Sequence, residues 1–224
     1  MGLRMQREKK RFDRIVDRLK RLMELLLIRH GLPEKVIRET GPADPPLAGA
    51  GLKQAELLAA YLEREQIDAL WTSPLQRARQ TAAPLAALKG LDVQVHDGVA
   101  EWDRNASEYI PIEELKESNS EAWQAMMRGE WVGELDPVTF TKLVVDSINE
   151  IIDQHRGQRV AVTCHGGVIN SYIGHVLEVP KHSFFQPEYT SIHRVMAASS
   201  GVRSVRTVNE IAHLRGTGLL SDRP

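Results

Sequence analysis

The feature that most constrains this chain is an apolar run that ends abruptly in an arginine, a histidine and a glycine. Leu25 to Ile28 is an uninterrupted apolar segment of strand length, and Arg29, His30 and Gly31 follow it directly. A strand that is buried on both faces has such a continuous run, and it is typical of a parallel sheet covered by helices. Because ligands of these sheets bind outside the carboxyl ends of the strands, Arg29 and His30 are expected at a functional edge.

A second segment repeats this arrangement. Arg159 to Cys164 has the pattern of another buried strand, and His165 and Gly166 end it. If both strands lie centrally in one parallel sheet, their carboxyl ends place His30 and His165 side by side. The glycines after His165 allow the backbone to approach closely, and the N–H groups that open the next helix suit an anion.

A third strand is expected to end at the same edge and to supply a second arginine. Ala69 to Thr72 reads as a short strand, and Ser73-Pro74 is a typical helix start with serine as the N-cap. Helical side chains lean toward the N-terminus, so Arg77 in the first turn reaches back over the strand ends. Two arginines and two histidines on one rim predict a phosphate site, because a guanidinium binds phosphate oxygens in pairs and stays charged.

Alternating strand and helix patterns predict an α/β fold, a three-layer α/β/α sandwich with a mostly parallel central sheet. Helices are predicted at about 47–62, 75–88 and 138–155 and after residue 166, and further strands at 93–95, 192–197 and 202–208. The proline-rich residues 32–46 are expected to form a loop beside the first strand. Residues 97–136 have weak periodicity and form a long excursion from the sheet.

Composition fits one main domain and disfavours several other classes of protein. The 224 residues are 42% hydrophobic and 26% charged, and a net charge of -1 gives no electrostatic reason to expect nucleic acid as a partner. No apolar segment is long enough to span a membrane, and we find no secretory signal, so we expect a cytoplasmic protein. Cys164 is the single cysteine and has no internal disulfide partner, as is usual in a reducing compartment.

The chain divides into a basic N-terminal extension, residues 1–22, and a main domain, residues 23–224. The extension carries nine Lys or Arg residues against three acidic ones, and its apolar residues have the spacing of an amphipathic helix. We favour a helix that docks on its own domain or on a second protomer of a homo-oligomer. The alternative is contact with an acidic membrane surface or with a partner protein.

The excursion of residues 97–136 is predicted to cap the phosphate site. From residue 101 onward it holds ten acidic side chains against three basic ones, which disfavours a polyanionic substrate unless the carboxylates face solvent. Its aromatic residues line the cap or serve only packing, and they are Trp102, Tyr109, Trp123 and Trp131. Weaker candidates for the border of the pocket are Asn170, Tyr189 and Ser191.

Three motifs together resemble one family. Arg29-His30-Gly31, the segment from Ser73 to Ala82 with Arg77 inside it, and His165-Gly166-Gly167 are similar, in this order, to motifs of the histidine phosphatase superfamily. This superfamily is also called the phosphoglycerate mutase-like family, and the likeness covers about residues 24–215. The resemblance implies the phosphoglycerate mutase-like fold and a phosphohistidine mechanism that requires neither a metal nor another cofactor.

The resemblance also implies roles for the site residues. His30 is the expected nucleophile, held neutral because nearby arginines lower its pKa, and His165 is expected to stabilise charge in the transition state. The residues expected to bind the substrate phosphate are Arg29, Arg77, Gly31 and Gly166. In this family a carboxylate after the third strand protonates the leaving oxygen, and Glu101 occupies that place, with Asp103 as the reserve candidate. Partial burial against Trp102 could bring the pKa of Glu101 near the working pH.

The sequence departs from common members of the family after two of its motifs. Pro33 and Val36 stand where those members have Thr and Asn, and residues 104–107 replace a small glycine-containing turn. We expect a phosphatase of the histidine acid phosphatase type that acts on a small phosphate monoester. The alternatives are a phosphoglycerate mutase and a non-catalytic module that binds a phospho-ligand or a protein on the same fold.

Other phosphate chemistries fit the sequence poorly. A cysteine phosphatase needs an arginine after five intervening residues, but Asn170 stands at that distance from Cys164, which therefore reads as a buried structural thiol. The chain has no phosphate-binding loop of the Gly-x4-Gly-Lys-Ser/Thr type, which argues against a nucleotide-driven kinase. It also lacks Cys-x2-Cys and His-x3-His spacings, so no metal site is expected.

Overall fold

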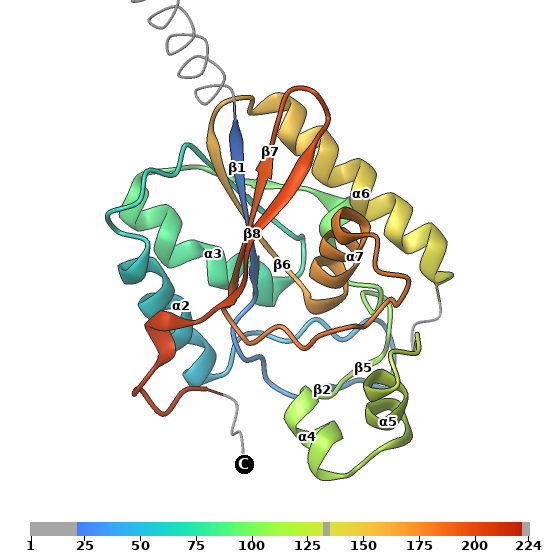
Figure 1. Cartoon of the computed structure of the whole chain (residues 1–224). Helices are drawn as coiled ribbons and strands as arrows, with labels where there is room; N and C mark the ends of the chain where they lie inside the picture. The colour runs from blue at the N-terminus through green and yellow to red at the C-terminus, as the bar shows by residue number, and fades with distance from the viewer. Residues whose placement is uncertain (1–21, 132–134, 221–224) are drawn as a thin grey trace, which may run out of the picture.

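A six-stranded sheet forms the centre of the protein, whose computed structural model describes residues 22–131 and 135–220 (Figure 1). In spatial order its strands are β4 (Val93–Val95), β3 (Ala69–Thr72), β6 (Arg159–Cys164), β1 (Met23–Arg29), β7 (Ile192–Ala197) and β8 (Arg203–Glu210). The first four of these strands are parallel, and β7 is antiparallel to both of its neighbours. The predicted mostly parallel sheet is confirmed.

Helices cover both faces of this sheet. On one face lie α2 (Gly49–Tyr61) and α3 (Gln76–Lys89), and on the other lie α6 (Pro137–Gln154) and α7 (Gly166–Leu177) (Figure 1). Leu25 and Leu27 of β1 pack into the core under α6 and α7, whereas Leu26 and Ile28 pack into the core under α2 and α3. All four side chains are fully buried, which explains the continuous apolar run in the sequence.

Three strands end together at one edge of the sheet. β1 and β6 are parallel neighbours, with Arg29 opposite Cys164, so the residues that follow both strands leave the sheet at the same level. β3 lies on the other side of β6, with Thr72 opposite Thr163. The segments after these three strands therefore begin side by side.

The helix after β3 begins later than predicted. Its N-cap is Leu75, whereas the sequence predicted Ser73 in that role. The reason is a long-range cap, because Asp44 Oδ1 in the proline-rich loop accepts a hydrogen bond from Gln76 N at 2.9 Å. Apart from this cap, the predicted boundaries of the helices and strands lie within two residues of those observed.

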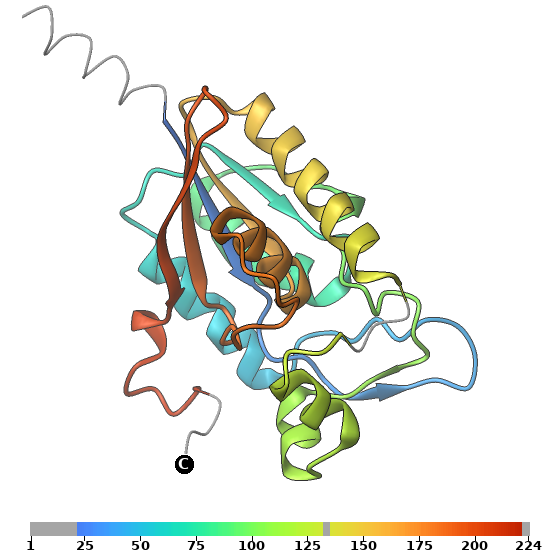
Figure 2. The ribbon, with the colours of Figure 1, turned by 45° about the vertical axis from the view of Figure 1, so that its right-hand side comes forward.

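The proline-rich loop and the excursion form one ribbon that the sequence did not predict. β2 (Val36–Ile37) pairs with β5 (Glu108–Tyr109) in antiparallel orientation. Short helices flank this pair, namely η1 (Asp97–Val99), α4 (Ile112–Glu117) and α5 (Glu121–Met127), and η2 (Ala212–Leu214) follows the last strand. Figure 2 shows the ribbon, α4 and α5 standing beyond the edge of the sheet where β1 and β6 end.

The predicted helix in residues 1–22 lies, except for Leu22, outside the described residues. Within residues 22–131 and 135–220, no helix combines the length and the apolar character that crossing a bilayer requires. Because residues 1–21 lie outside the described part of the chain, the structure does not test whether the extension docks on its own domain, on a second protomer or on a partner.

Candidate active site

His30 and His165 lie side by side just beyond the ends of β1 and β6. Their ring centroids are 5.1 Å apart, and both side chains are buried. His30 N still donates to Cys164 O at 2.9 Å, so the sheet fixes the backbone of the first histidine against the strand that leads to the second. This is the juxtaposition that the two strand ends predicted.

One ring nitrogen of His30 is fixed by a hydrogen bond to its own backbone. Nδ1 lies 2.7 Å from Gly31 O, and because a carbonyl oxygen only accepts, Nδ1 carries the proton. The lone pair of the neutral ring is then on Nε2. Burial, Arg77 and Arg29 together lower the pKa of His30 well below its ordinary value, so the ring is neutral at neutral pH.

His165 has one partner and one buried nitrogen without a partner. Its Nε2 lies 2.7 Å from Ser73 Oγ, and its Nδ1 has no hydrogen-bond partner among the described residues. Burial, Arg77 and His30 lower the pKa of His165. An unsatisfied buried nitrogen costs free energy, and beside His30 it indicates a ligand position. This contact of Ser73 was not predicted from the sequence, although the residue follows the third strand that ends at the same edge.

Arg29 reaches the site without a carboxylate partner among the described residues. Its Nη1 donates to Pro187 O at 2.6 Å, and its guanidinium carbon lies 4.0 Å from the ring centroid of Tyr189. Its Nε is buried and has no partner in the described part of the chain. Tyr189 also lies 5.8 Å from His30, ring to ring, so this weak candidate contacts two site residues.

Arg77 is only 1% exposed and approaches the site from the first turn of α3. Its Nη2 donates to Asp103 Oδ1 at 3.2 Å, and its guanidinium carbon lies 4.6 Å from the ring centroid of Tyr109. Its Nε is another buried donor that no described residue satisfies. Both arginines therefore have donors left for an anion.

Glu101 is a buried carboxyl group beside the N-terminus of α7. Its Oε2 accepts from Gly167 N at 2.8 Å and its Oε1 from Trp102 N at 3.2 Å. Burial and, to a lesser extent, the nearby charge of Asp103 raise the pKa of Glu101 to about 7. Burial also raises the pKa of Asp103, and Arg77 opposes this rise. A carboxyl group poised near neutral pH suits a proton donor.

The glycines of the motifs differ in whether the surrounding structure leaves room for a side chain. A Cβ atom on Gly31 would lie 2.7 Å from Gly51 O, and one on Gly167 would lie 2.2 Å from Glu101 Oε1. A Cβ on Gly166 has ordinary space, with Arg29 Nε as its nearest neighbour at 3.9 Å. The close approach that was predicted after His165 therefore occurs at Gly167, while Gly166 lines the cavity beside Arg29.

The floor of a cavity of about 400 Å³ is formed by site residues, and residues of the excursion line much of its wall. The floor residues are Arg29, His30, Arg77, Glu101, Gly166 and Gly167. Of the four aromatic residues of the excursion, Trp102, Tyr109 and Trp131 are in the cavity lining and Trp123 is not. Asn170 lines the cavity as predicted. Ser191 instead lies behind the site, where its carbonyl oxygen accepts from Arg29 N at 3.1 Å.

Cys164 and the metal-ligating residue types do not form a second site here. Cys164 is fully buried as predicted, and burial raises the pKa of its thiol. Within the described residues, no three His, Cys, Asp or Glu side chains are grouped so that they could hold a metal ion.

Fold and site together define a phosphoglycerate mutase-like phosphatase. The family model of the histidine phosphatase superfamily (branch 1) matches residues 25–210, so the chain belongs to this superfamily. The motifs Arg29-His30-Gly31 and His165-Gly166-Gly167 fall inside the matched range, and the family prediction is confirmed.

Similar proteins include several phosphatases. Phosphoserine phosphatase 1 of Hydrogenobacter thermophilus is 33% identical over 155 residues, which are 64% of this chain and 71% of that protein. The bifunctional protein Rv2228c of Mycobacterium tuberculosis is 29% identical over 198 residues, and the chain spans only about half of its length, 54%. The structure of a phosphoserine phosphatase mutant from Entamoeba histolytica with phosphoserine has the same fold, with a TM-score of 0.68, 23% identity and coverage of 86% and 99% of the two chains.

Proposed function

We propose that this phosphatase hydrolyses a small phosphate monoester through a phosphohistidine on His30. The observation that carries the proposal is a set of buried side-chain nitrogens without hydrogen-bond partners in the described residues, namely Arg29 Nε, Arg77 Nε and His165 Nδ1. They come from three separate segments that meet around His30. A tetrahedral phosphoryl group satisfies donors that converge in this way, and two guanidinium groups offset its charge.

In the first step, the lone pair of His30 Nε2 attacks phosphorus while the bond from phosphorus to the ester oxygen breaks. The leaving oxygen takes a proton from Glu101, whose pKa of about 7 leaves much of it protonated at neutral pH. Arg29, Arg77 and His165 hold the other phosphoryl oxygens as charge develops on them. The product alcohol then leaves.

In the second step, Glu101 accepts a proton from a water molecule. The water oxygen attacks phosphorus, and the bond between phosphorus and His30 Nε2 breaks. Inorganic phosphate is released, and Glu101 is protonated again for the next cycle. The two steps divide one difficult displacement into two easier ones.

The two pKa values favour activity on the acid side of neutrality, as expected for a phosphatase of the acid type. His30 attacks only when neutral, and burial with Arg77 and Arg29 keeps its pKa well below the ordinary value. Glu101 donates only when protonated, and its pKa is about 7. We expect kcat/KM to be maximal between these two values and to fall as the pH rises through 7.

The test is to locate the phosphoryl group and to measure hydrolysis of p-nitrophenyl phosphate with a chelator present. We expect the full chain to be active, with one phosphoryl group on the peptide that contains His30 after a base quench. His30→Asn should lower kcat/KM by at least about 10⁴-fold, because the nucleophile is lost. His175→Asn, which changes an exposed histidine of α7, is the matched control and should leave kcat/KM unchanged.

Retained activity in His30→Asn, or a phosphoryl group on another residue, contradicts the proposal. Phosphoserine is one natural ester to assay, because two of the similar proteins named above are phosphoserine phosphatases. The mutase alternative is assayed in the same preparation as conversion between 2-phosphoglycerate and 3-phosphoglycerate. Conversion faster than release of inorganic phosphate would favour the mutase.

A further inference from the structure

The cavity above the phosphate site has a largely apolar wall. The side chains that line it beyond the floor include Trp102, Ile112, Leu115, Met126, Trp131 and Phe184. They surround the space that the alcohol part of a phosphate ester occupies when its phosphoryl group is bound at His30. The chemistry of this wall therefore decides which alcohol fits.

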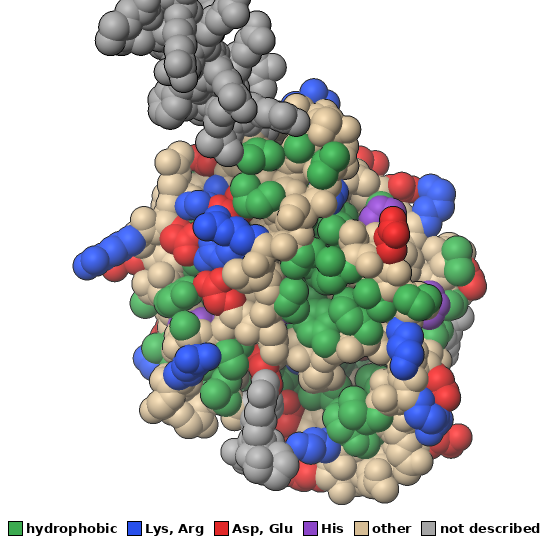
Figure 3. All heavy atoms as spheres, in the orientation of Figure 1, with side chains coloured by type: hydrophobic (Ala, Val, Ile, Leu, Met, Phe, Trp, Pro, Cys, Tyr) green, Lys and Arg blue, Asp and Glu red, His purple; other side chains and the backbone are tan. Residues whose placement is uncertain are grey.

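Part of the wall comes from two helices that have no fully buried residue, α4 and α5. Ile112, Leu115 and Met126 are only half-buried and face the cavity, and Met127 beside them is 56% exposed. Figure 3 shows hydrophobic side chains gathered on the surface at α4 and α5. An apolar group bound in the cavity would remove these side chains from water. The hydrophobic effect would then stabilise the complex.

The wall is held in a fixed position relative to the phosphate site. Tyr189 Oη donates to Glu113 Oε2 of α4 at 3.0 Å, and the ring of Tyr189 faces the guanidinium of Arg29. The pairing of β2 with β5 holds the same region at Tyr109, which faces Arg77. Both arginines are thus joined to the cap by an aromatic ring, so the cavity has its shape before a ligand binds.

The charges of the cavity disfavour a second negative group on the substrate. Arg29 and Arg77 are the only Lys or Arg residues in its described lining, and both lie at the phosphate floor. The other charged residues in the lining are carboxylic acids, Glu101, Asp103 and Glu108. A carboxylate on the alcohol would therefore lie near other carboxyl groups without a cation of its own, which costs free energy.

The amide of Asn170 does not replace the missing cation. Its Nδ2 donates to Gly166 O at 3.0 Å and to Phe185 O at 3.1 Å, and its Oδ1 accepts from Phe184 N at 3.1 Å. These bonds use the amide inside the protein. They also fix Phe184 and Phe185 as part of the wall.

We propose that the natural substrate is the phosphate monoester of an uncharged, apolar alcohol with a long alkyl chain or an aromatic ring. This inference rests on the proposed hydrolysis through His30 and adds the class of alcohol to it. It separates this chain from the phosphoserine phosphatases among its relatives, because phosphoserine carries a carboxylate. It also separates the chain from a mutase, because phosphoglycerate carries one as well.

The first experiment compares primary-alcohol phosphates, which have similar leaving oxygens. We measure kcat/KM of the wild-type full chain for ethyl, butyl, hexyl and octyl phosphate, and for phosphoserine, 3-phosphoglycerate and phosphocholine. We expect kcat/KM to rise about two- to fourfold per added methylene until the cavity is filled. Hexyl phosphate should exceed phosphoserine and 3-phosphoglycerate by at least about 16-fold, the gain over ethyl phosphate that four methylenes give at twofold each.

The second experiment places a cation in the wall. Met126→Arg should raise kcat/KM for phosphoserine and 3-phosphoglycerate by at least about tenfold and should flatten the alkyl series. Leu143→Arg adds the same charge at a side chain of α6 that is 48% exposed and outside the cavity lining, so it should leave both sets of values unchanged. Met126→Ala removes apolar atoms from the wall without adding charge. It should reduce the rise of kcat/KM with alkyl chain length and should not raise kcat/KM for the charged esters.

The outcomes distinguish this inference from the proposed function. If the wild type turns over phosphoserine, 3-phosphoglycerate or phosphocholine as well as hexyl phosphate, or if the alkyl series is flat, the apolar alcohol is wrong while hydrolysis through His30 stands. If no ester is hydrolysed, including p-nitrophenyl phosphate, the proposed function fails and this inference fails with it.

Discussion

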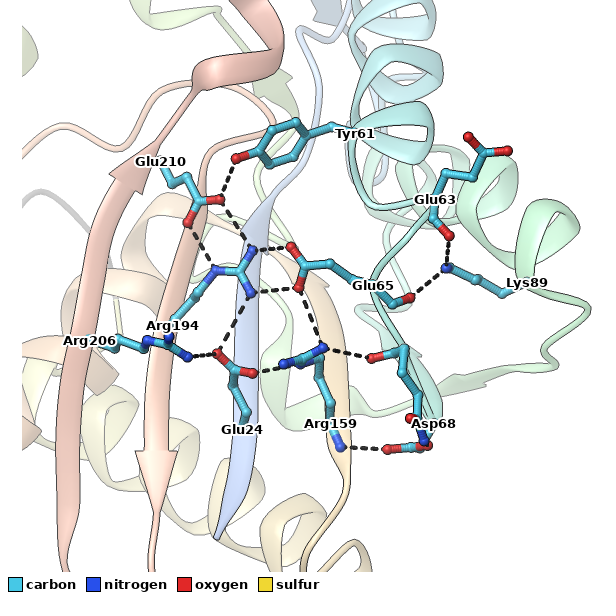
Figure 4. Close-up of polar contacts among 11 residues, drawn as sticks. Glu24, Tyr61, Glu63, Glu65, Asp68, Lys89, Arg159, Arg194, Arg206 and Glu210 are labelled. Carbon is cyan, nitrogen blue, oxygen red and sulfur yellow. Dashed lines mark hydrogen bonds and ion pairs between the residues drawn. The ribbon is translucent and has the colours of Figure 1, made fainter. Parts of the chain in front are cut away.

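Two clusters of arginine side chains lie against the same sheet and differ in what faces them. The ion-pair cluster lies beside the C-terminal end of α2 and consists of Glu24, Glu65, Arg159, Arg194, Arg206 and Glu210 (Figure 4). The phosphate cluster lies where β1 and β6 end and consists of Arg29, His30, Arg77 and His165. The first cluster is neutralised from within, and the second is not.

In the ion-pair cluster each arginine meets a carboxylate. Arg194 lies 2.7 Å from Glu65 and 2.9 Å from Glu210, and Glu24 lies 2.6 Å from Arg159 and 3.1 Å from Arg206. Figure 4 shows the guanidinium of Arg194 among the three glutamates that it contacts, Glu24, Glu65 and Glu210. Its hydrogen bonds to Glu65 lower the pKa of that carboxyl group, so this cluster joins the strands to the segment that follows α2 by charge.

In the phosphate cluster the same side chain has few anionic partners. Arg77 has one carboxylate partner, Asp103, at 3.2 Å, and Arg29 has none within the described residues. Buried cations without counter-charge destabilise a folded protein unless a ligand supplies the charge. Complete ion pairs therefore indicate a structural cluster, whereas incomplete ones indicate the place where an anion binds.

The strongest way to break this comparison is to remove the charge of Arg77. Arg77→Met should lower kcat/KM for p-nitrophenyl phosphate by about 10³-fold, because a donor to the transition state is lost. The melting temperature should stay the same or rise, because a buried cation with a single weak partner has been removed. Steady-state kinetics and thermal melting check both parts, and a large loss of stability would show that Arg77 is structural like Arg194.

The same change in the other cluster should have the opposite effect. Arg194→Met leaves Glu210 without its cation and Glu65 with only Arg159, at 3.7 Å, and these carboxylates are only 19% and 27% exposed. We expect a loss of about 2–4 kcal/mol in the free energy of unfolding, with kcat/KM of the folded protein within about twofold of wild type. Denaturant titration and kinetics well below the melting temperature measure the two quantities.

Arg206→Met is the matched control for this second variant. The side chain of Arg206 is 60% exposed although it contacts Glu24, so its loss should cost below about 1 kcal/mol. Equal destabilisation by Arg194→Met and Arg206→Met would mean that burial does not decide the strength of these ion pairs. A loss of activity in Arg194→Met without a loss of stability would end the distinction between the clusters.

The sequence predicted the centre of the fold well because its strands are buried on both faces. β3 and β6 have the predicted ends, and Leu25 to Ile28 lies inside β1. The cap of α3 by Asp44 and the pairing of β2 with β5 were missed, because each joins residues distant in the sequence. Periodicity reports which face of a segment is buried, but it does not report which distant polar group completes a turn.

The residues of the site also fall into those that could be predicted from the sequence and those that could not. The positions of His30, His165 and Arg77 followed from where strands end, which is a property of parallel sheets. The role of Glu101 came from the family resemblance alone, because a glutamate in an excursion is by default solvated. Ser73 beside His165 and the need for glycine at Gly167 depend on contacts between elements, and no local pattern contains those contacts.

The smallest expected effect sharpens the comparison at Asp103, the one carboxylate that is paired with an arginine of the phosphate cluster. Its charge raises the pKa of Glu101, and Arg77 lowers it. Asp103→Asn removes the negative charge that raises the pKa of Glu101. It also leaves Arg77 without its carboxylate partner, so that Arg77 lowers this pKa more strongly, and the pKa of Glu101 falls. Since the proton donor is competent only below its pKa, the loss of kcat/KM at high pH should begin at a lower pH than in wild type.

A pH profile of kcat/KM for an alkyl phosphate measures this shift, because an alkoxide leaving group needs the proton. Glu108→Gln removes an exposed carboxylate from the cavity lining and should leave the profile in place. The same profile decides between the two candidate donors. If Asp103→Asn abolishes turnover of the alkyl phosphate but retains turnover of p-nitrophenyl phosphate, whose leaving group needs no proton, then Asp103 is the donor and the burial of Glu101 serves another purpose.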